Sequence, residues 1–137
     1  MEAVRTAFVT SEGGRSYDLG PDHPLTPLRR RLAVDLIRAY GLTARPGVTE
    51  IAAAPADDAL IERVHAPAYV RAVKRYSAAP ALAAEWEARQ WGLAPGGDTP
   101  AFAGMHEAAA AVCGASVTGA MEVWEGRADQ AFVAGGG

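Results

Sequence analysis

The stretch MHEAAAAVCGASVTGAMEVWEGRADQAFVAGGG, residues 105–137, decides how this sequence folds. Small apolar residues recur at helical spacing from 105 to 125 and predict one long helix, with a face that another layer can approach closely. That face consists of Met105, Ala108, Val112, Ala115, Gly119 and Val123. The run QAFVA at 130–134 predicts a strand of the sheet on which the helix packs. Three glycines follow it, and glycines after a strand usually lead into a turn.

Two further runs upstream have the composition of strands. TAFVT at 6–10 is a short β-prone run closed by SEGG, and GVTEIAAAP at 47–55 is a second. Helical segments separate the three strands, and parallel strands need such crossover connections. We therefore expect an α/β domain with a parallel sheet. Three strands make a small sheet for a complete doubly wound fold.

The helix expected between the first two strands has signals at both ends. Thr26 can cap it, Pro27 suits the first helical position, and Gly41 fits the left-handed residue that ends it. Four large apolar residues recur every four positions and predict a stripe that faces a core. They are Leu28, Leu32, Leu36 and Tyr40.

Two shorter helices should precede a loop rich in glycine and proline. Asp57 or Asp58 can cap a helix through Val64, and Pro67 starts another. Tyr69, Val73 and Tyr76 lie on one side of the second of these helices. The alanine-rich segment 78–87 is expected to be helical, and residues 91–104 then form the loop.

Composition narrows the class of protein. The chain has 137 residues, half of them apolar, which suits one folded domain or part of one and excludes a disordered chain. A net charge of −3 provides no large positive field for nucleic acid or an anionic membrane. A single cysteine, Cys113, excludes a disulfide framework and a Cys-rich zinc site, and it favours a reducing, cytoplasmic setting. Neither a secretory signal nor an apolar run of about 18 residues is present.

The common catalytic templates are absent from the sequence. His23, His65 and His106 lie in different elements, and none has metal-ligand spacing to another histidine, to cysteine or to a carboxylate pair. Taken alone, each histidine is more readily explained as structural. A G-x-S-x-G elbow and a Walker loop are also missing. From these patterns the function of the α/β domain stays unassigned.

Five segments in a fixed order nevertheless resemble a known family. They are YDLGPDHPLTPLR (17–29), YGL (40–42), VHAPAYV (64–70), GGDTPAFAGMHEAA (96–109) and AFVAGGG (131–137). Together they are similar to the N-terminal part of the zinc-dependent histone deacetylases, and most closely to the bacterial acetoin-utilisation type. The H-P-x-x-P-x-R core at 23–29 and the D-T-P-x-F segment at 98–102 carry most of the likeness.

The resemblance implies the three-layer, parallel-sheet arginase/deacetylase fold, of which residues 1–137 are expected to form the truncated N-terminal portion. Family members use zinc to polarise the amide of acetyl-lysine or of a related acetylated amine and to activate a water. Their twin histidines follow the glycines that correspond to 135–137, and further zinc ligands come later. The chain is therefore expected to end before the metal site, to contain no catalytic or metal-binding residue and to be inactive alone.

The resemblance also implies roles for individual residues. Asp98 matches a rim carboxylate that accepts hydrogen bonds from substrate backbone amides, whereas the residues alone favour a turn-capping aspartate. Gly136 and Gly137 match glycines along the substrate channel. Arg29 matches an arginine that holds or guides acetate product, and at most one arginine of Arg29–Arg31 is expected to point inward. His23 and His65 match positions whose role is architectural, such as hydrogen bonding that holds loops.

A different class of function stays open at this point. The chain could be a non-enzymatic interaction module derived from the deacetylase fold, with an exposed sheet edge that pairs with a partner. A small-molecule binding domain ranks last because no cradle motif is present. The expected partners are an acetylated protein or small amine for the full-length form, with no nucleic acid and no membrane. Neither the natural substrate, the physiological metal nor the oligomeric state follows from the sequence.

Overall fold

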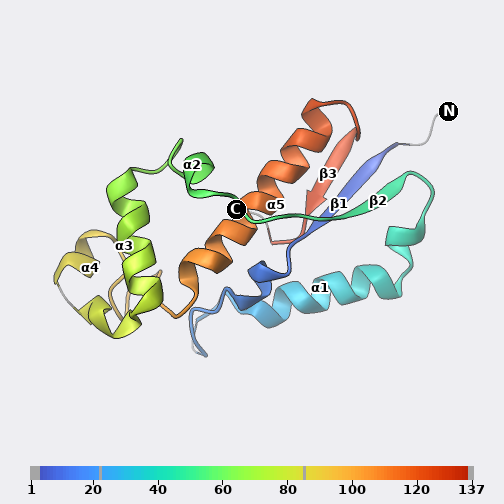
Figure 1. The fold of residues 1–137 in the computed structure, drawn as a ribbon. Coiled ribbons are helices and arrows are strands. Elements are labelled where there is room, and N and C mark those ends of the chain that lie inside the picture. The colour runs from blue at the N-terminus through green and yellow to red at the C-terminus, as the bar shows by residue number, and fades with distance from the viewer. Residues whose placement is uncertain (1–3, 22, 85, 136–137) are drawn as a thin grey trace.

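Three parallel strands form the centre of the structure, with helices on both faces of the sheet (Figure 1). The computed structural model describes residues 4–21, 23–84 and 86–135. Its helices and strands follow in the order β1 (Thr6–Thr10), α1 (Pro27–Ala39), β2 (Val48–Ala52), α2 (Asp58–Ile61), α3 (Pro67–Ala78), α4 (Trp86–Gln90), α5 (Met105–Trp124) and β3 (Gln130–Val133). Short 3-10 helices lie at Gly13–Ser16, Leu42–Ala44 and Pro80–Ala84. All three predicted strands are confirmed.

The sheet has the order β2-β1-β3, so the first strand of the chain is the central one. Thr6 of β1 is opposite Val48 on one side and Gln130 on the other, and both pairings are parallel. Parallel neighbours need crossover connections, which α1 provides between β1 and β2 and the later helices provide between β2 and β3. The predicted α/β class with a parallel sheet is confirmed.

Side chains of β1 alternate between two apolar layers. Ala7 and Val9 are buried with Ala115 of α5, whereas Phe8 is buried with Val34 of α1 on the opposite face. Val9 has no exposed surface, and burial of a side chain of this size stabilises the fold by roughly 1.5–3 kcal/mol. The central strand therefore has an apolar layer on each face, which makes this part of the molecule a three-layer structure.

The apolar stripe predicted to face the core on α1 is exposed, and that prediction is wrong. Leu32 and Leu36 are 54% and 57% exposed, whereas Val34 is 7% exposed and packs on Phe8. The face of α1 that meets the sheet instead carries Val34 and the partly buried Ile37, which pack with Phe8 of β1. Arg38 pairs with Glu50 of β2 at the surface.

The ends of the helices mostly match their sequence signals. Thr26 occupies the N-cap of α1, although its side chain makes no capping hydrogen bond, and Gly41 has the expected left-handed backbone with φ of 65°. Asp57 caps α2 by accepting a hydrogen bond from the Leu60 backbone N–H at 2.8 Å. That helix ends at Ile61, one turn earlier than predicted.

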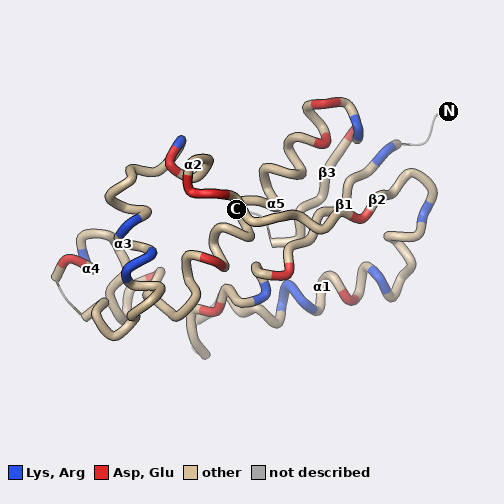
Figure 2. Tube along the Cα trace, in the orientation of Figure 1, with Lys and Arg blue, Asp and Glu red and all other residues tan. Residues whose placement is uncertain are grey.

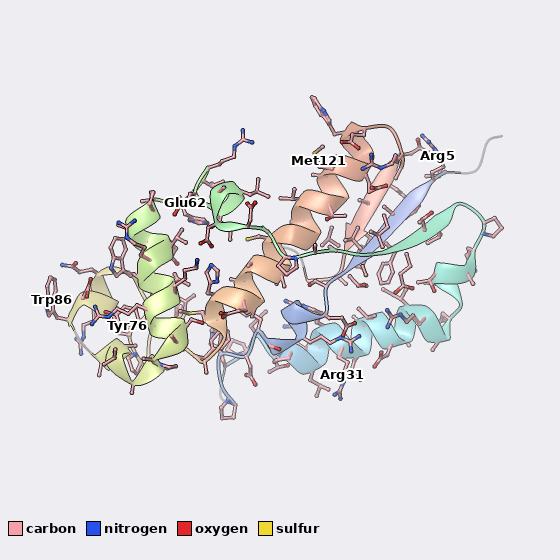
Figure 3. The ribbon with its side chains drawn as sticks, viewed as in Figure 1. Arg5, Arg31, Glu62, Tyr76, Trp86 and Met121 are labelled. Atoms are coloured by element: carbon pink, nitrogen blue, oxygen red, sulfur yellow. The ribbon has the colours of Figure 1, made fainter. Side chains whose placement is uncertain are left out.

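A second core lies between α3, α4 and the start of α5. Tyr76 is completely buried there, and Tyr69 and Val73, which were predicted to lie on the same side of α3, pack in the same cluster. Figure 3 shows Tyr76 inside this group of helices and Trp86 pointing away from it. Since α5 also packs on the sheet, this one helix joins the two cores (Figure 1).

Small residues let other segments approach α5 closely, as predicted. Met105, Ala108, Ala115 and Gly119 are buried, whereas Val123 in the last turn is 42% exposed. A methyl group added to Gly119 would lie 2.7 Å from the Val133 side chain of β3. The sheet therefore packs on this face of the helix at a distance that a larger residue would increase.

Charged residues of both signs are interspersed along the chain (Figure 2). Acidic residues of α2 are close to basic residues of α3, where Lys74 pairs with Asp58. Within the described ranges, none of the helices combines the length and the apolar character that crossing a bilayer requires.

Candidate functional site

Asp98 is presented by a loop, residues 92–104, that three hydrogen bonds close on itself; we call it the Asp98 loop. The Thr99 hydroxyl donates to the Gly92 carbonyl at 2.9 Å, and the Ala101 N–H donates to the Leu93 carbonyl at 3.1 Å. The Gly97 N–H closes a turn on Ala94 at 3.2 Å. The Asp98 side chain is exposed, and within the described part of the chain its carboxylate accepts no hydrogen bond. This geometry differs from a turn-capping aspartate and leaves the carboxylate available to a ligand.

A histidine from a distant part of the sequence contacts this loop. The Nε2 atom of His23 lies 3.0 Å from the Asp98 carbonyl oxygen, and its Nδ1 atom lies 3.0 Å from the Leu25 backbone nitrogen. His23 belongs to the segment that leads into α1, residues 17–26, which we call the His23 loop. The prediction that His23 holds loops together is confirmed by these contacts.

An aromatic pair joins the same two loops. Tyr17 of the His23 loop packs edge-on against Phe102 of the Asp98 loop, with ring centroids 5.5 Å apart. Burial raises the pKa of the Tyr17 hydroxyl. His65, the other histidine expected to be architectural, is exposed and rests against the Tyr69 ring at 5.5 Å. The two loops are thus connected by one polar and one apolar contact.

The three consecutive arginines of α1 point in different directions. Arg29 is exposed, and among the described residues no hydrogen bond or ion pair joins it to Asp98. Arg30 points inward and donates a hydrogen bond to the Gly14 carbonyl. Arg31 is exposed on the side of α1 that faces away from the sheet (Figure 3). One inward arginine agrees with the sequence expectation, while the product-channel role of Arg29 stays a prediction.

Arg30 lies at the carboxyl ends of β1 and β3. A methyl group added to Gly135 would overlap its guanidinium, so the glycine after β3 permits this close approach. Burial lowers the pKa of Arg30, but a guanidinium stays charged over the ordinary pH range. Gly136 and Gly137, the predicted channel glycines, lie outside the described residues.

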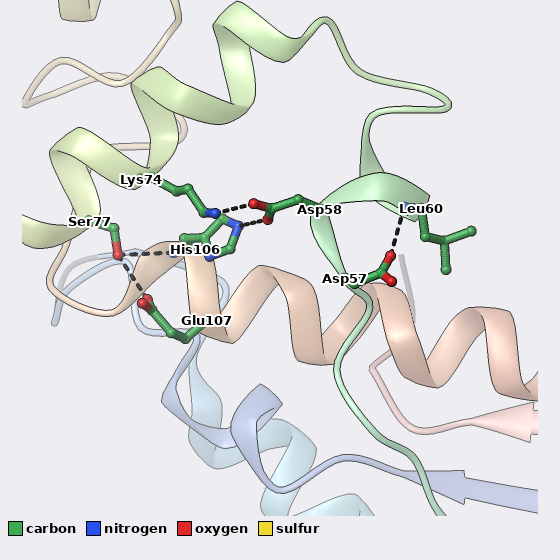
Figure 4. A network of polar contacts seen from close by, with 7 residues as sticks. All are labelled: Asp57, Asp58, Leu60, Lys74, Ser77, His106 and Glu107. Atoms are coloured by element: carbon green, nitrogen blue, oxygen red, sulfur yellow. Dashed lines mark hydrogen bonds and ion pairs between the residues drawn. The ribbon is translucent and has the colours of Figure 1, made fainter.

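A network of polar side chains joins α2, α3 and α5 (Figure 4). The Asp58 carboxylate lies 3.1 Å from the Nε2 atom of His106 and also pairs with Lys74. Ser77 donates to Glu107 at 3.0 Å and accepts from the His106 backbone N–H at 3.1 Å. The sequence analysis did not identify this network, because its members are dispersed over 50 positions and form no recognisable spacing.

A cavity of about 150 Å³ separates these groups from the two loops. Its wall includes Tyr17 of the His23 loop, Thr99 of the Asp98 loop, and Cys113 of α5. Most of the wall is apolar, so the cavity suits an apolar group better than a charged one. The arrangement brings Asp98, His23 and Tyr17 into one region and leaves Arg29 on the exposed side of α1.

Candidate metal ligands are not gathered in this region. Within the described ranges, no three or more side chains of His, Cys, Asp and Glu are placed to hold a metal ion. The described residues therefore do not provide the donor set that a tetrahedral zinc site requires. What they can do chemically is present an exposed carboxylate, that of Asp98, on a fixed loop and a guanidinium, that of Arg30, beside the end of the sheet.

Comparison with known proteins gives concordant matches. The acetoin utilization protein AcuC of Bacillus subtilis is 33% identical over 132 residues, and histone deacetylase clr6 of Schizosaccharomyces pombe is 27% identical over 133. These alignments cover 96% and 97% of this chain but 33% and 32% of the relatives. The chain thus spans about a third of the length of the curated relatives it matches.

The fold has a counterpart among solved structures. The crystal structure of the HDA15 HD domain matches with a TM-score of 0.68 and 21% sequence identity, over 96% of this chain and 35% of that one. At this identity the likeness concerns the fold alone. A model of the histone deacetylase domain matches residues 23–137, which include His23 and the whole Asp98 loop. A match over most of its length shows that this chain belongs to the histone deacetylase family.

Proposed function

We propose that residues 1–137 form the N-terminal portion of a single deacetylase domain, which hydrolyses acetyl-lysine or a related acetylated amine. Membership of the family and coverage of a third of its members support this proposal. In it, the catalytic zinc is held by polypeptide outside these residues, and zinc supplies Lewis-acid chemistry in the complete enzyme. The described residues supply scaffold and part of the substrate entrance.

The observation that carries the proposal is the free carboxylate of Asp98. A carboxylate that has no partner among the described residues can accept hydrogen bonds from two N–H groups of a peptide substrate. A hydrogen bond to a charged group contributes about 1.5–3 kcal/mol, enough to fix how an acyl-lysine side chain enters. Asp98 thereby orients the substrate and takes no part in bond breaking. Gly136 and Gly137 are proposed to line the channel.

The arginines of α1 are assigned to the acetate product. The family resemblance gives this task to Arg29, whereas the structure offers Arg30 as a second candidate because its guanidinium lies half-buried beside Gly14 and Gly135. A guanidinium can hold acetate through two parallel N–H bonds. Of the two, Arg30 has a guanidinium fixed by a contact inside the fold, whereas Arg29 is exposed.

An interaction module is the second candidate function. The outer edges of β2 and β3 have no neighbouring strand among the described residues, and Phe132 of β3 is 52% exposed. An open edge of this kind can pair with a strand of a partner. This candidate requires that the 137 residues act without deacetylase chemistry.

One experiment separates the two candidates. The coding sequence downstream of Gly137 is determined, the complete open reading frame and the 137-residue chain are purified, and both are assayed on an acetyl-lysine peptide. We expect the complete protein to hydrolyse the peptide and Asp98→Ala to lower its kcat/KM by about 10- to 100-fold. An inactive complete protein, or metal-dependent hydrolysis by the 137-residue chain, would contradict the proposal.

A further inference from the structure

The His23 imidazole is held in one tautomer by its two contacts. Its Nδ1 atom lies 3.0 Å from the Leu25 backbone nitrogen, and a backbone N–H can only donate. Nδ1 must therefore be the unprotonated, accepting nitrogen of a neutral ring. The proton is then on Nε2, which points at the Asp98 carbonyl oxygen 3.0 Å away and donates to it.

The bond to Asp98 crosses from one loop to another. Seventy-five positions separate His23 from Asp98, whereas the Gly92, Leu93 and Ala94 carbonyls are bonded from within the Asp98 loop. Those local bonds set the shape of the loop but not its place relative to the rest of the entrance. The His23 bond fixes the backbone at the residue whose carboxylate is free.

The His23 loop has its own internal bonds and leads directly into α1. The Asp18 carboxylate accepts from the Gly20 N–H at 3.0 Å, and the His23 N–H donates to the Gly20 carbonyl at 3.2 Å. These local bonds set the shape of the turn, whereas its place is set by α1, which begins at Pro27 and packs on the sheet through Val34. The imidazole therefore projects from a turn that is continuous with a helix packed on the sheet. A loop bonded to such a support loses freedom to carry its carboxylate away from the substrate.

We propose that His23 is a positioning residue for substrate binding, which acts by holding the Asp98 backbone so that the Asp98 carboxylate meets the substrate amides. The inference rests on the proposed role of Asp98 and adds to it the residue that fixes the carboxylate in place. His23 itself does not contact the substrate. Its contribution passes through a single hydrogen bond from a neutral imidazole.

Two substitutions of His23 test its contacts with Leu25 and Asp98 separately. His23→Asn keeps an acceptor close to the backbone, which can take the Leu25 N–H as asparagine does in turns, but its side chain is too short to reach Asp98. His23→Gln has a longer side chain that can donate to the Asp98 carbonyl. The first variant should therefore keep the turn and lose the link, and the second should restore the link.

Hydrogen exchange of the 137-residue chain tests the link without reference to catalysis. We expect His23→Asn to speed amide exchange in residues 97–101, and His23→Gln to return it toward wild type. His65→Asn is the matched control, since this exposed histidine rests against Tyr69 and, among the described residues, makes no hydrogen bond to the Asp98 loop. Unchanged exchange in His23→Asn would overturn the inference.

A double-mutant cycle in the complete deacetylase tests the functional part. Loss of one neutral hydrogen bond should raise KM for an acetyl-lysine peptide by roughly two- to tenfold in His23→Asn. His23→Gln should recover most of this loss. Asp98→Ala removes the carboxylate but keeps the carbonyl, so adding His23→Asn to it should cause no further change.

The outcomes can be told apart. An equal loss from His23→Asn in the wild-type and Asp98→Ala backgrounds would show a role that does not pass through Asp98, and would overturn the inference. A strong effect of Asp98→Ala beside a neutral His23→Asn would overturn the inference and keep the proposed function. A neutral Asp98→Ala would overturn the proposed role of Asp98 and the inference with it.

Discussion

At the scale of single residues, Asp58 of the polar network contacts side chains from two other helices. Its carboxylate accepts from Lys74 of α3 and from the His106 ring of α5, although it begins a helix of only four residues. The hydrogen bond from Lys74 is the main reason that the pKa of Asp58 is lowered. One side chain thus connects α2 to two longer helices.

We predict that this network makes stability depend on acid pH. A carboxyl whose pKa is lowered by folding binds protons more weakly in the folded chain, so its contribution is complete above the ordinary carboxyl pKa of about 4 and is lost as pH falls through the lower, folded value. Asp58→Asn should flatten the fall in unfolding free energy below about pH 4. Urea unfolding measured between neutral and acid pH checks this.

Two other groups, Lys74 and Glu107, serve as controls for the pH prediction. Lys74→Met should flatten the same part of the curve, because the group that lowers the Asp58 pKa is gone. Glu107, whose pKa is lowered first by its own backbone N–H and then by Ser77, should keep part of the slope in both variants. An Asp58→Asn protein with the wild-type slope would show that the ion pair does not persist in solution.

Residue-scale features were only partly predictable from the sequence. The architectural role of His23 was predicted because the family resemblance marks its position, and its contacts confirm this role. The identity of its partner was not predicted, because 75 positions separate the two residues. The sequence predicts that at most one of three consecutive arginines points inward, and the structure shows that this residue is Arg30.

At the scale of elements, α5 depends on glycine where another segment crosses it. The Ala56 N–H donates to the Ala110 carbonyl at 2.9 Å, and the backbone from Ala54 to Ala56 passes directly over Gly114. A methyl group on Gly114 would lie 2.7 Å from the Ala56 nitrogen. Backbone atoms cannot rotate away as a side-chain tip can, so the clash must move the whole segment.

We predict that replacing a glycine of α5 by alanine has two effects of opposite sign on the unfolding free energy, a gain from helix propensity and a loss from overpacking. Glycine to alanine in a free helix interior gains about 1 kcal/mol, whereas overpacking costs roughly 1–3 kcal/mol and sometimes more. Gly114→Ala should therefore lower the unfolding free energy in urea. Gly119→Ala is the matched comparison and should cost less, because its added methyl meets the Val133 side chain. A stabilised Gly114→Ala protein would contradict this close packing.

The strands and helices were predictable because their signals are local, while the orientation of α1 was not. Pro27 and Gly41 mark its ends within a few residues, and the three strands are short apolar runs. The leucine spacing predicts a stripe but not which layer covers it. That depends on which residues the sheet meets, and in the structure Val34 and Ile37 pack with Phe8 of β1 while the leucines stay exposed.

At the scale of the whole molecule, one surface combines several exposed apolar side chains. They belong to α1 and to the residues close to its two ends, with exposed fractions between 47% and 73%: Leu25, Leu28, Leu32, Leu36 and Tyr40. Contiguous apolar patches of this kind are uncommon on monomeric proteins and usually mark an interaction surface. We call these five residues the α1 stripe.

We predict that the 137-residue chain associates through the α1 stripe. Exposed leucines gain free energy when a second apolar surface removes them from water, at roughly 25 cal/mol per Å². Sedimentation velocity should show concentration-dependent association, and the double variant Leu32→Gln/Leu36→Gln should weaken it with little change in unfolding free energy, because neither side chain packs in the core. Trp124→Gln, which removes an exposed aromatic outside the stripe, is the control. A wild-type chain that stays monomeric across the concentration range would contradict the prediction.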